Sequence, residues 1–174
     1  MEKRLPEHFY YLGVAESVSK RSTCLNKHYG AVIVSNHEII ATGYNGAPRG
    51  RQNCCDRGIC YRIEHNIPRG TRYETCRSVH AEQNAIISAA RADMLHSTMY
   101  IYGYDCITDK VVKDVNSCTM CKRMIINAGI DMVVFADPDI GIGCDGVPYQ
   151  AKIIKVQDWI TNDDSLNDPG SAGY

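Results

Sequence analysis

The sequence lacks any apolar run that approaches the ~20 residues of a membrane-spanning helix. It begins MEKRLPEHFYYLG, which has no apolar stretch of the kind that directs secretion. An excess of charge of one sign is missing too, because 19 basic residues balance 20 acidic ones and the formal net charge is −1. These absences disfavour membrane and nucleic-acid partners. We therefore expect a cytoplasmic protein that binds small molecules.

The chain is long enough for one compact domain, since it has 174 residues of which 44% are hydrophobic. The sequence shows no internal repeat and no sign of a second domain. Its last stretch, TNDDSLNDPGSAGY, is polar and poor in residues that could pack. We expect one domain over residues 1–160 and a flexible polar tail over residues 161–174.

Cysteine, by contrast, is abundant: there are nine, at positions 24, 54, 55, 60, 76, 106, 118, 121 and 144. An odd number cannot pair completely within one chain, and a reducing cytoplasm keeps thiols free. The clusters therefore indicate metal binding rather than disulfides. Cys106 and Cys144 are better explained as small buried apolar residues.

Helices are predicted from apolar spacing and flanking caps over residues 6–20, 78–91 and 118–128. Ser78 is the expected N-cap of the second helix. Its buried stripe is expected to consist of Ala85, Ile86, Ala89 and Ala90. Gly129 is expected to end the third helix.

Strands are predicted from β-branched runs over residues 31–34, 39–42, 97–104, 131–136 and 151–160, the last running into a short turn or helix. A polar turn joins the first two strands, which predicts a hairpin. Residues 46–77 show no periodicity and predict a long loop that needs something to order it. The alternation of strands and helices after the hairpin predicts a layered α/β domain with a mixed sheet.

Two predicted helix starts carry residue types that bind zinc. In SVHAEQNAI, His80 and Glu82 fall in the first turn, where both side chains can reach a point beyond the helix end. In SCTMCKRMIINAGI, Cys118 and Cys121 are three apart and share one side of the first turn. His80, Cys118 and Cys121 supply three ligands and leave a fourth tetrahedral position open, as in catalytic zinc sites.

Glu82 then serves as the group that takes a proton from water at the open position and passes protons to a substrate. A histidine–x–glutamate pair or a pair of cysteines three apart is weak evidence alone. Both patterns together at helix starts match the zinc nucleobase deaminases. Two other interpretations stay open: a buried histidine beside a closed four-ligand zinc, and a non-enzymatic zinc-binding module.

At these residues the sequence resembles the cytidine and deoxycytidylate deaminase superfamily, and deoxycytidylate (dCMP) deaminases most of all. The similarity covers roughly residues 5–136 and rests on RSTCLNKHYGAVIV, ATGYNGAPRG, NCCD, SVHAEQNAI and SCTMCKRMIINAGI. It implies a three-layer α/β/α sandwich with a mixed five-stranded sheet. It also implies zinc on His80, Cys118 and Cys121, with Glu82 as the proton shuttle.

The activity implied by this resemblance is hydrolytic deamination of dCMP to dUMP and ammonia. The Ala81 backbone N–H and the loop carrying Asn45 are implied to hold the pyrimidine and the sugar. Arg21 and Ser22 look like residues near the nucleotide in this family, which favours Arg21 as the partner of the 5′-phosphate. Deamination of another cytosine nucleotide, or of a base in tRNA, stays an alternative.

The sequence departs from the family pattern in two places. The family usually has proline before its first catalytic cysteine, whereas this chain has Ser117, which is expected to cap the helix instead. A segment of the chain, DCITDKVVKDVN, also stands where the family needs only a few residues. We expect this insertion, residues 105–116, to border the active site as a lid or as part of the substrate wall.

The remaining clustered cysteines lie in the segments that need ordering. Four thiolates from separate segments would clamp the long loop to the hairpin through a second, closed zinc. Some deoxycytidylate deaminases resemble this arrangement at residues matching Cys24 and Cys54. The expected ligands are Cys24, Cys54, Cys60 and Cys76, with Cys55 as the likeliest substitute.

The same loop is basic, with arginines at positions 49, 51, 57, 62, 69, 72 and 77. These are explained either as solvated charges that balance zinc thiolates or as phosphate-binding groups. Related enzymes are often hexamers that dCTP activates and dTTP inhibits. A homo-oligomer is therefore expected, with Tyr44, Gly46 and Arg91 as candidate effector or interface residues.

Overall fold

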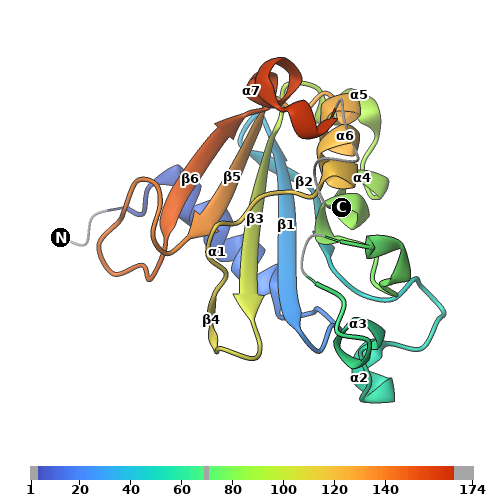
Figure 1. The fold of residues 1–174 in the computed structure, drawn as a ribbon. Coiled ribbons are helices and arrows are strands. Elements are labelled where there is room, and N and C mark those ends of the chain that lie inside the picture. Colours follow the sequence, from blue (N-terminus) through green and yellow to red (C-terminus); the bar gives the residue numbers. More distant parts are fainter. Residues whose placement is uncertain (1–3, 69–70, 167–174) are drawn as a thin grey trace.

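The structure is a computed structural model that describes residues 4–68 and 71–166 (Figure 1). The helices are α1 Glu7–Ser19, α2 Cys54–Arg57, α3 Tyr61–Glu64, α4 Ala81–Ile87, α5 Arg91–Met94, α6 Thr119–Ala128 and α7 Val156–Asn162. The strands are β1 Lys27–Ser35, β2 Glu38–Tyr44, β3 Thr98–Asp105, β4 Lys110–Val111, β5 Met132–Asp137 and β6 Gln150–Lys155. Two 3-10 turns cover Tyr73–Thr75 and Asp164–Leu166. Within the described ranges, no helix is long and apolar enough to cross a membrane.

The strands form one mixed sheet in the order β2-β1-β3-β5-β6. The predicted hairpin is confirmed, because β1 and β2 pair antiparallel from Gly30 opposite Tyr44 to Ser35 opposite Glu38. Strands β3 and β5 run parallel, as a connection through α6 requires. The expected count of five strands is corrected to six, because Lys110–Val111 of the insertion adds the short strand β4 to β3.

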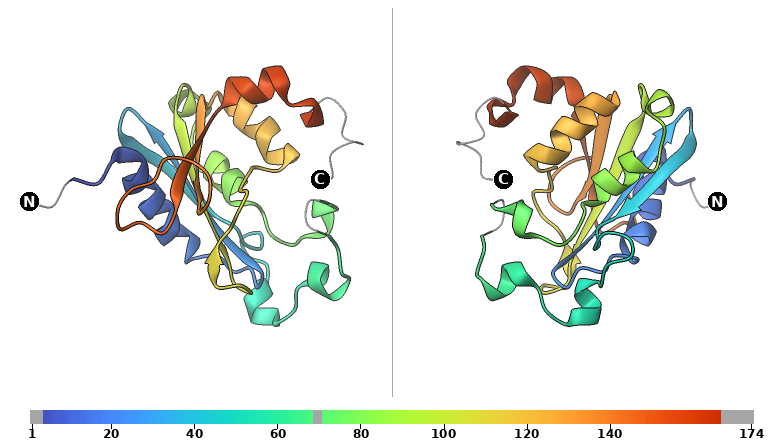
Figure 2. Two further views of the ribbon diagram at one scale, coloured as in Figure 1. Left: turned by 60° about the vertical axis from the view of Figure 1, so that its left-hand side comes forward. Right: turned by 90° about the vertical axis from the view of Figure 1, so that its right-hand side faces the viewer.

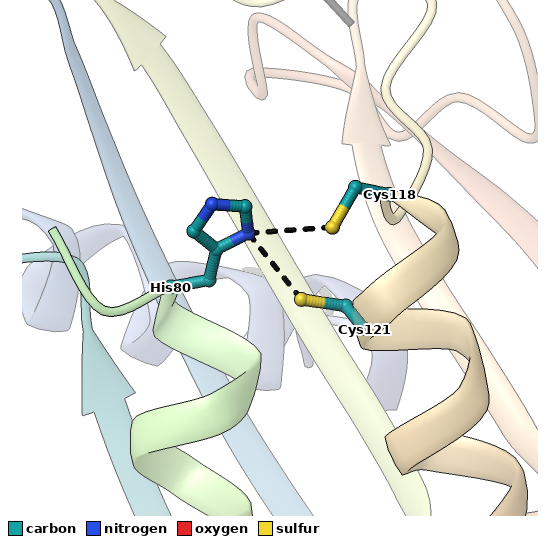
Figure 3. A group of neighbouring side chains, drawn as sticks. All are labelled: His80, Cys118 and Cys121. Carbon is teal, nitrogen blue, oxygen red and sulfur yellow. Dashed lines mark hydrogen bonds between the residues drawn. The ribbon is translucent and has the colours of Figure 1, made fainter. Parts of the chain in front are cut away.

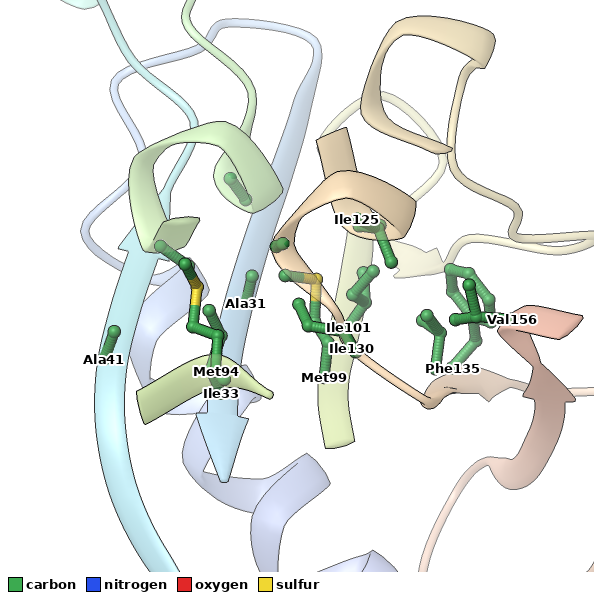
Figure 4. Close-up of a cluster of buried hydrophobic side chains, with 14 of the residues drawn as sticks. Ala31, Ile33, Ala41, Met94, Met99, Ile101, Ile125, Ile130, Phe135 and Val156 are labelled. Carbon is green, nitrogen blue, oxygen red and sulfur yellow. The ribbon is translucent and has the colours of Figure 1, made fainter. Parts of the chain in front are cut away.

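Helices cover both faces of the sheet, which confirms the three-layer arrangement (Figure 2). Alternate residues of each strand point to opposite faces. Val32, Val134 and Ala136 pack with α1 on one face, whereas Ile33, Val133 and Phe135 pack on the face that carries α4 and α6. Figure 4 shows this second core, in which Met94, Ile125 and Val156 lie near strand residues such as Met99 of β3.

Two glycines let helices approach the sheet closely. A Cβ at Gly43 of β2 would lie 2.3 Å from the Ala81 carbonyl oxygen and 2.3 Å from the Ala85 nitrogen. One at Gly30 of β1 would lie 2.1 Å from the Ala15 carbonyl oxygen. Real side chains do not tolerate such distances, so these positions keep α4 and α1 at their observed depth.

The helix predicted over residues 78–91 is wrong at both ends. Val79 pairs with Gly46 in an isolated antiparallel bridge, which holds residues before His80 extended. The N-cap is therefore His80, and the Ser78 hydroxyl is buried without a hydrogen-bond partner among the described residues. Helix α4 already ends at Ile87, and Ala90, expected in the buried stripe, is exposed.

The expected tail is ordered over its first residues. Thr161 and Asn162 belong to α7, the Lys122 ammonium forms an ion pair with the Asp163 carboxylate, and Leu166 packs against the core. Residues 161–166 therefore contact the domain, and the flexibility of the tail stays a prediction. Residues 167–174 lie outside the described residues.

Candidate metal centre and active site

Helices α4 and α6 begin side by side next to strand β3, and the side chains of their first turns converge (Figure 3). His80 is the N-cap of α4 and Cys118 the N-cap of α6, while Cys121 lies one turn further along α6. His80 Nδ1 lies 3.5 Å from Cys118 Sγ and 3.4 Å from Cys121 Sγ. In the described part of the chain, these three residues form the group whose ligand atoms all lie within 4.8 Å of one another.

These distances fit a single zinc ion. A tetrahedral site with Zn–N near 2.0 Å and Zn–S near 2.3 Å separates a nitrogen from a sulfur ligand by about 3.5 Å. Imidazole and thiolate are also ligand types that zinc prefers. The residues are therefore compatible with zinc in both chemistry and spacing.

The two sulfurs differ in how readily they lose a proton. The hydrogen bond with Cys121 lowers the pKa of the Cys118 thiol to about 4, and the His80 ring acts in the same direction. The hydrogen bond with Cys118, followed by burial, raises the pKa of Cys121. These contacts favour the thiolate form of Cys118, which is the form in which cysteine binds metal.

Glu82, the second residue of α4, lies next to this cluster and is 8% exposed. Its Oε1 accepts a hydrogen bond of 3.0 Å from the Ser117 hydroxyl. The expectation that Ser117 caps α6 is therefore wrong: Cys118 occupies the cap position, and the serine side chain reaches across to α4.

A cavity of about 500 Å³ opens over the cluster. Among the predicted site residues, His80, Ala81, Glu82, Cys118 and Asn45 line it. Its wall also includes residues that sequence reasoning did not assign, namely Asn26, Lys27, Tyr29, Ile63, Asn66, Ile67, Tyr73, Ser78 and Ile101. Most of these come from the strand β1 end and the long loop, where a single sequence gives no periodic signal.

The Asn45 side chain is fixed by its neighbours. Its Oδ1 accepts hydrogen bonds from the Tyr29 N–H at 2.7 Å and the Ser22 hydroxyl at 2.6 Å. Its Nδ2 donates to the Lys27 carbonyl oxygen at 2.9 Å. Ser22, expected near the nucleotide, does not line the cavity and acts instead on Asn45.

The cationic residues that line the cavity are Lys27 and Arg62, not Arg21. Arg21 is exposed just after α1, outside the cavity lining. Arg62 donates from Nη1 to the Arg72 carbonyl oxygen at 2.7 Å and from Nη2 to the Pro68 carbonyl oxygen at 2.8 Å. Its guanidinium also lies 4.9 Å from the centre of the Tyr73 ring, which meets the His80 ring edge-on.

Residues 6–137 match the family model described as the cytidine and deoxycytidylate deaminase zinc-binding region. The chain belongs to this family. Its zinc-binding character agrees with the histidine–cysteine–cysteine cluster, and both indicate a zinc cofactor at that cluster.

Individual relatives agree with the family assignment. The chain is 34% identical over 126 residues to deoxycytidylate deaminase of Schizosaccharomyces pombe, an alignment that covers 72% of this chain but 35% of the yeast protein. It is 33% identical over 132 residues to deoxycytidylate deaminase of Mycobacterium phage D29, covering 72% of this chain and 91% of the phage protein. The chain therefore matches only about a third of the fission-yeast protein but nearly all of the phage protein.

A solved structure shows the same fold. The apo dCMP deaminase of cyanophage S-TIM5 is similar with a TM-score of 0.53 and 28% sequence identity, over 76% of this chain and 85% of that chain. The sandwich expected from the resemblance is therefore confirmed by a second member of the family.

Of the four loop cysteines expected to bind a second zinc, Cys24, Cys60 and Cys76 line the cavity and Cys54 is buried. Among the described residues, their sulfurs do not form a group in which all lie within 4.8 Å of one another. Burial raises the pKa of Cys54, and the neighbouring Cys24, Cys60 and Cys76 raise it further. Cys55, the expected substitute, is exposed and its thiol faces Asp56. Cys106 and Cys144, expected to be buried, are only partly so.

The candidate effector residues have structural contacts. The Tyr44 carbonyl oxygen accepts a hydrogen bond of 2.8 Å from the Asn84 side chain of α4. Gly46 exchanges backbone hydrogen bonds of 3.2 and 2.8 Å with Val79, directly before His80. Arg91 donates from Nε to the Asn127 carbonyl oxygen at the end of α6. The first two contacts link the GYNG loop to α4 and to the residue before its N-cap, His80.

The second half of the insertion packs into the domain beside the cavity. Val112 and Val115 are each 2% exposed, and the Val115 N–H donates to the buried Asp137 carboxylate. Lys152 donates to the Val115 carbonyl oxygen at 3.0 Å. Val115 and Asn116 line the cavity, as expected for a segment that borders the active site.

Proposed function

We propose that this chain catalyses hydrolytic, zinc-dependent deamination of dCMP to dUMP and ammonia. The observation that carries the proposal is the convergence of His80, Cys118 and Cys121 beside the buried Glu82, at a cavity that His80, Glu82 and Cys118 line. The names of the aligned relatives, deoxycytidylate deaminases from yeast and phage, support the substrate.

His80, Cys118 and Cys121 would hold the zinc ion, which when bound lowers the pKa of water and stabilises negative charge. Glu82 takes one proton from the water that attacks C4 and delivers it to N3, and then takes the second proton from the hydroxyl formed at C4 and delivers it to the departing amino group. The ring gains the water oxygen at C4 and loses ammonia. The Ala81 N–H and the fixed amide of Asn45 would orient the pyrimidine and sugar, which brings C4 to the attacking water.

The nucleotide phosphate is assigned to Arg62 and Lys27 in place of Arg21. A guanidinium has five N–H donors, and the two carbonyl contacts of Arg62 use two of them. These contacts and Tyr73 hold the side chain in one orientation, so little further entropy is lost when a phosphate binds. Lys27 forms an ion pair with Asp105, with a nitrogen–oxygen distance of 2.9 Å, and adds positive charge to the same cavity.

The proposal is tested by ammonia release across dCMP, deoxycytidine, CMP, dCTP and guanine. The expected result is the highest kcat/KM for dCMP. A higher kcat/KM for another of these compounds would change the assigned substrate but not the assigned reaction, hydrolytic deamination. Zinc binding without release from any of them would favour a non-enzymatic zinc module.

A second zinc on Cys24, Cys54, Cys60 and Cys76 is part of the proposal. Its support is that Cys24, Cys60 and Cys76 line the same cavity and that all three influence the pKa of the buried Cys54. Arg77 lies close enough to lower the pKa of Cys54, and its positive charge would balance the thiolates. Such a site would clamp the loop that carries Arg62.

We also propose that residues 1–160 form the deaminase domain, that the protein is cytoplasmic, and that it assembles as a homo-oligomer, with a hexamer favoured. The bridge between Gly46 and Val79 would transmit binding of dCTP or dTTP at the GYNG loop to His80. Light scattering gives the oligomeric state. Steady-state kinetics should show a sigmoidal dCMP response that dCTP makes hyperbolic and dTTP opposes. Hyperbolic curves that neither nucleotide alters would refute regulation.

A further inference from the structure

We propose that Ser117 is a positioning residue whose hydroxyl holds the Glu82 carboxylate in its reactive orientation. The inference rests on the proposed function of Glu82. Its geometric basis is the hydrogen bond of 3.0 Å from Ser117 Oγ to Glu82 Oε1.

The contact is buried on both sides, which makes it stronger and more selective than a surface hydrogen bond. Ser117 is 4% exposed and Glu82 is 8% exposed. A hydroxyl that donates to a carboxylate forms a charge-assisted bond, and water competes poorly in such a setting. The bond joins two segments 35 residues apart, the start of α4 and the residue before α6.

Glu82 needs such a partner because its side chain has three rotatable bonds. The last of these torsions is broad, so a carboxylate without a partner samples many orientations of its plane. Fixing Oε1 from α6 restricts that rotation and sets the direction of the other oxygen. General acid–base catalysis depends on this geometry, because protons transfer only between groups within hydrogen-bond reach.

The identity of the residue matters, because a side chain without a hydrogen-bond donor at this position could not reach Glu82 in this way. Serine adds a donor next to a metal ligand without serving the helix start, since Cys118 is the N-cap and Ser117 lies outside α6. The contact also places the catalytic acid–base group and the metal ligands in one linked unit, with Ser117 and Cys118 adjacent in the chain.

The test compares Ser117→Thr with Ser117→Val, two side chains of the same shape that differ in the hydroxyl. We expect Ser117→Thr to keep kcat for dCMP within about threefold of the wild type, and Ser117→Val and Ser117→Ala to lose about 10- to 100-fold, as for partners that orient active-site groups. KM and zinc per chain should change little. Ser97→Ala is the matched control, since Ser97 is also buried and its hydroxyl donates to the Met94 carbonyl oxygen, away from the cavity.

Equal kcat values for the threonine and valine variants would overturn the inference. A loss of kcat in Ser117→Val that is accompanied by an equal loss of zinc or of folded protein would also overturn it, because the role of Ser117 would then be structural. A double-mutant cycle gives a second readout. Because Ser117 is proposed to act through Glu82, Ser117→Ala in a Glu82→Gln background should lower the residual rate less than twofold. Absence of turnover in the wild-type protein would instead contradict the proposed function, so the two failures are distinguishable.

Discussion

His80 Nδ1 lies 3.4 Å from Cys121 Sγ, although the two residues are 41 positions apart in the chain. The sheet brings them together, because α4 and α6 both pack on the face that carries Ile33 and Phe135. The ligand spacing is therefore a product of how the two helices pack on the sheet.

Replacement of a ligand should separate metal binding from folding. We expect Cys121→Ala to reduce zinc at this site to below half occupancy and to abolish turnover, while circular dichroism shows the same secondary structure. The matched control is Cys144→Ala, since Cys144 lies outside the cavity lining. Full zinc content in Cys121→Ala would remove this residue from the ligand set.

The loop cysteines give a second metal prediction. We expect two zinc ions per chain in the wild type and one in Cys54→Ser, with a lower melting temperature because the loop loses its clamp. The neighbouring Cys55→Ser should leave both values unchanged, since Cys55 is exposed. Metal analysis that finds one zinc in the wild type, unaltered by either change, would refute the second site.

Arg62 should determine the preference for a nucleotide over a nucleoside. Loss of a charged hydrogen bond costs about 1.5–3 kcal/mol, so Arg62→Ala should lower kcat/KM for dCMP roughly 10- to 100-fold. Turnover of deoxycytidine should be unaffected, which also shows that the loop remains ordered. Arg21→Ala is the control and should behave as wild type. A loss of kcat/KM for dCMP in Arg21→Ala, with Arg62→Ala behaving as wild type, would instead assign phosphate binding to Arg21.

The pair formed by Lys27 and Asp105 predicts a pH-dependent contribution to stability. Burial opposes ionisation of Asp105, but the hydrogen bonds from Lys27 and from backbone N–H groups outweigh it and lower its pKa. A carboxyl with a lowered folded-state pKa stabilises the protein above its unfolded pKa of about 3.9, and this contribution is lost as pH falls through the folded-state value.

Asp105→Asn should therefore reduce the free energy of unfolding by roughly 1 kcal/mol at pH 7, with a gap to wild type that closes below about pH 4. Denaturant melts at several pH values measure this gap. Asp139→Asn is the control, because its pair with Lys113 is more than half exposed on both sides. A gap that persists unchanged at low pH would show that the carboxylate charge is not its source.

The site residues were predictable where the signal is local. His80, Glu82, Cys118 and Cys121 stand at helix starts, and the residue types and spacings within each turn indicate their chemistry. Ser117 was not predictable in its role, because serine before a helix favours a cap, while its partner Glu82 is distant in sequence. Arg62 could not be separated from the other arginines, since its position depends on carbonyl groups of the folded loop.

The fold was predictable where the sequence pattern is local. It was not predictable where an element depends on contacts between distant segments. The strands and α6 follow apolar periodicity and have clear boundaries at Gly129 and the turns. The start of α4 was placed too early, because the bridge between Gly46 and Val79 involves two distant segments. Strand β4 was missed because two residues carry no periodic pattern.

The most direct test of the account is turnover and zinc content measured on the same preparation of Glu82→Gln. Glutamine keeps the shape of the side chain and can still accept the hydrogen bond from Ser117, but it cannot shuttle protons. We expect unchanged zinc per chain and a loss of kcat for dCMP of at least about 10²-fold, as for a general acid–base group. A Glu82→Gln protein that deaminates dCMP at a near-normal rate with zinc in place would contradict the assigned mechanism.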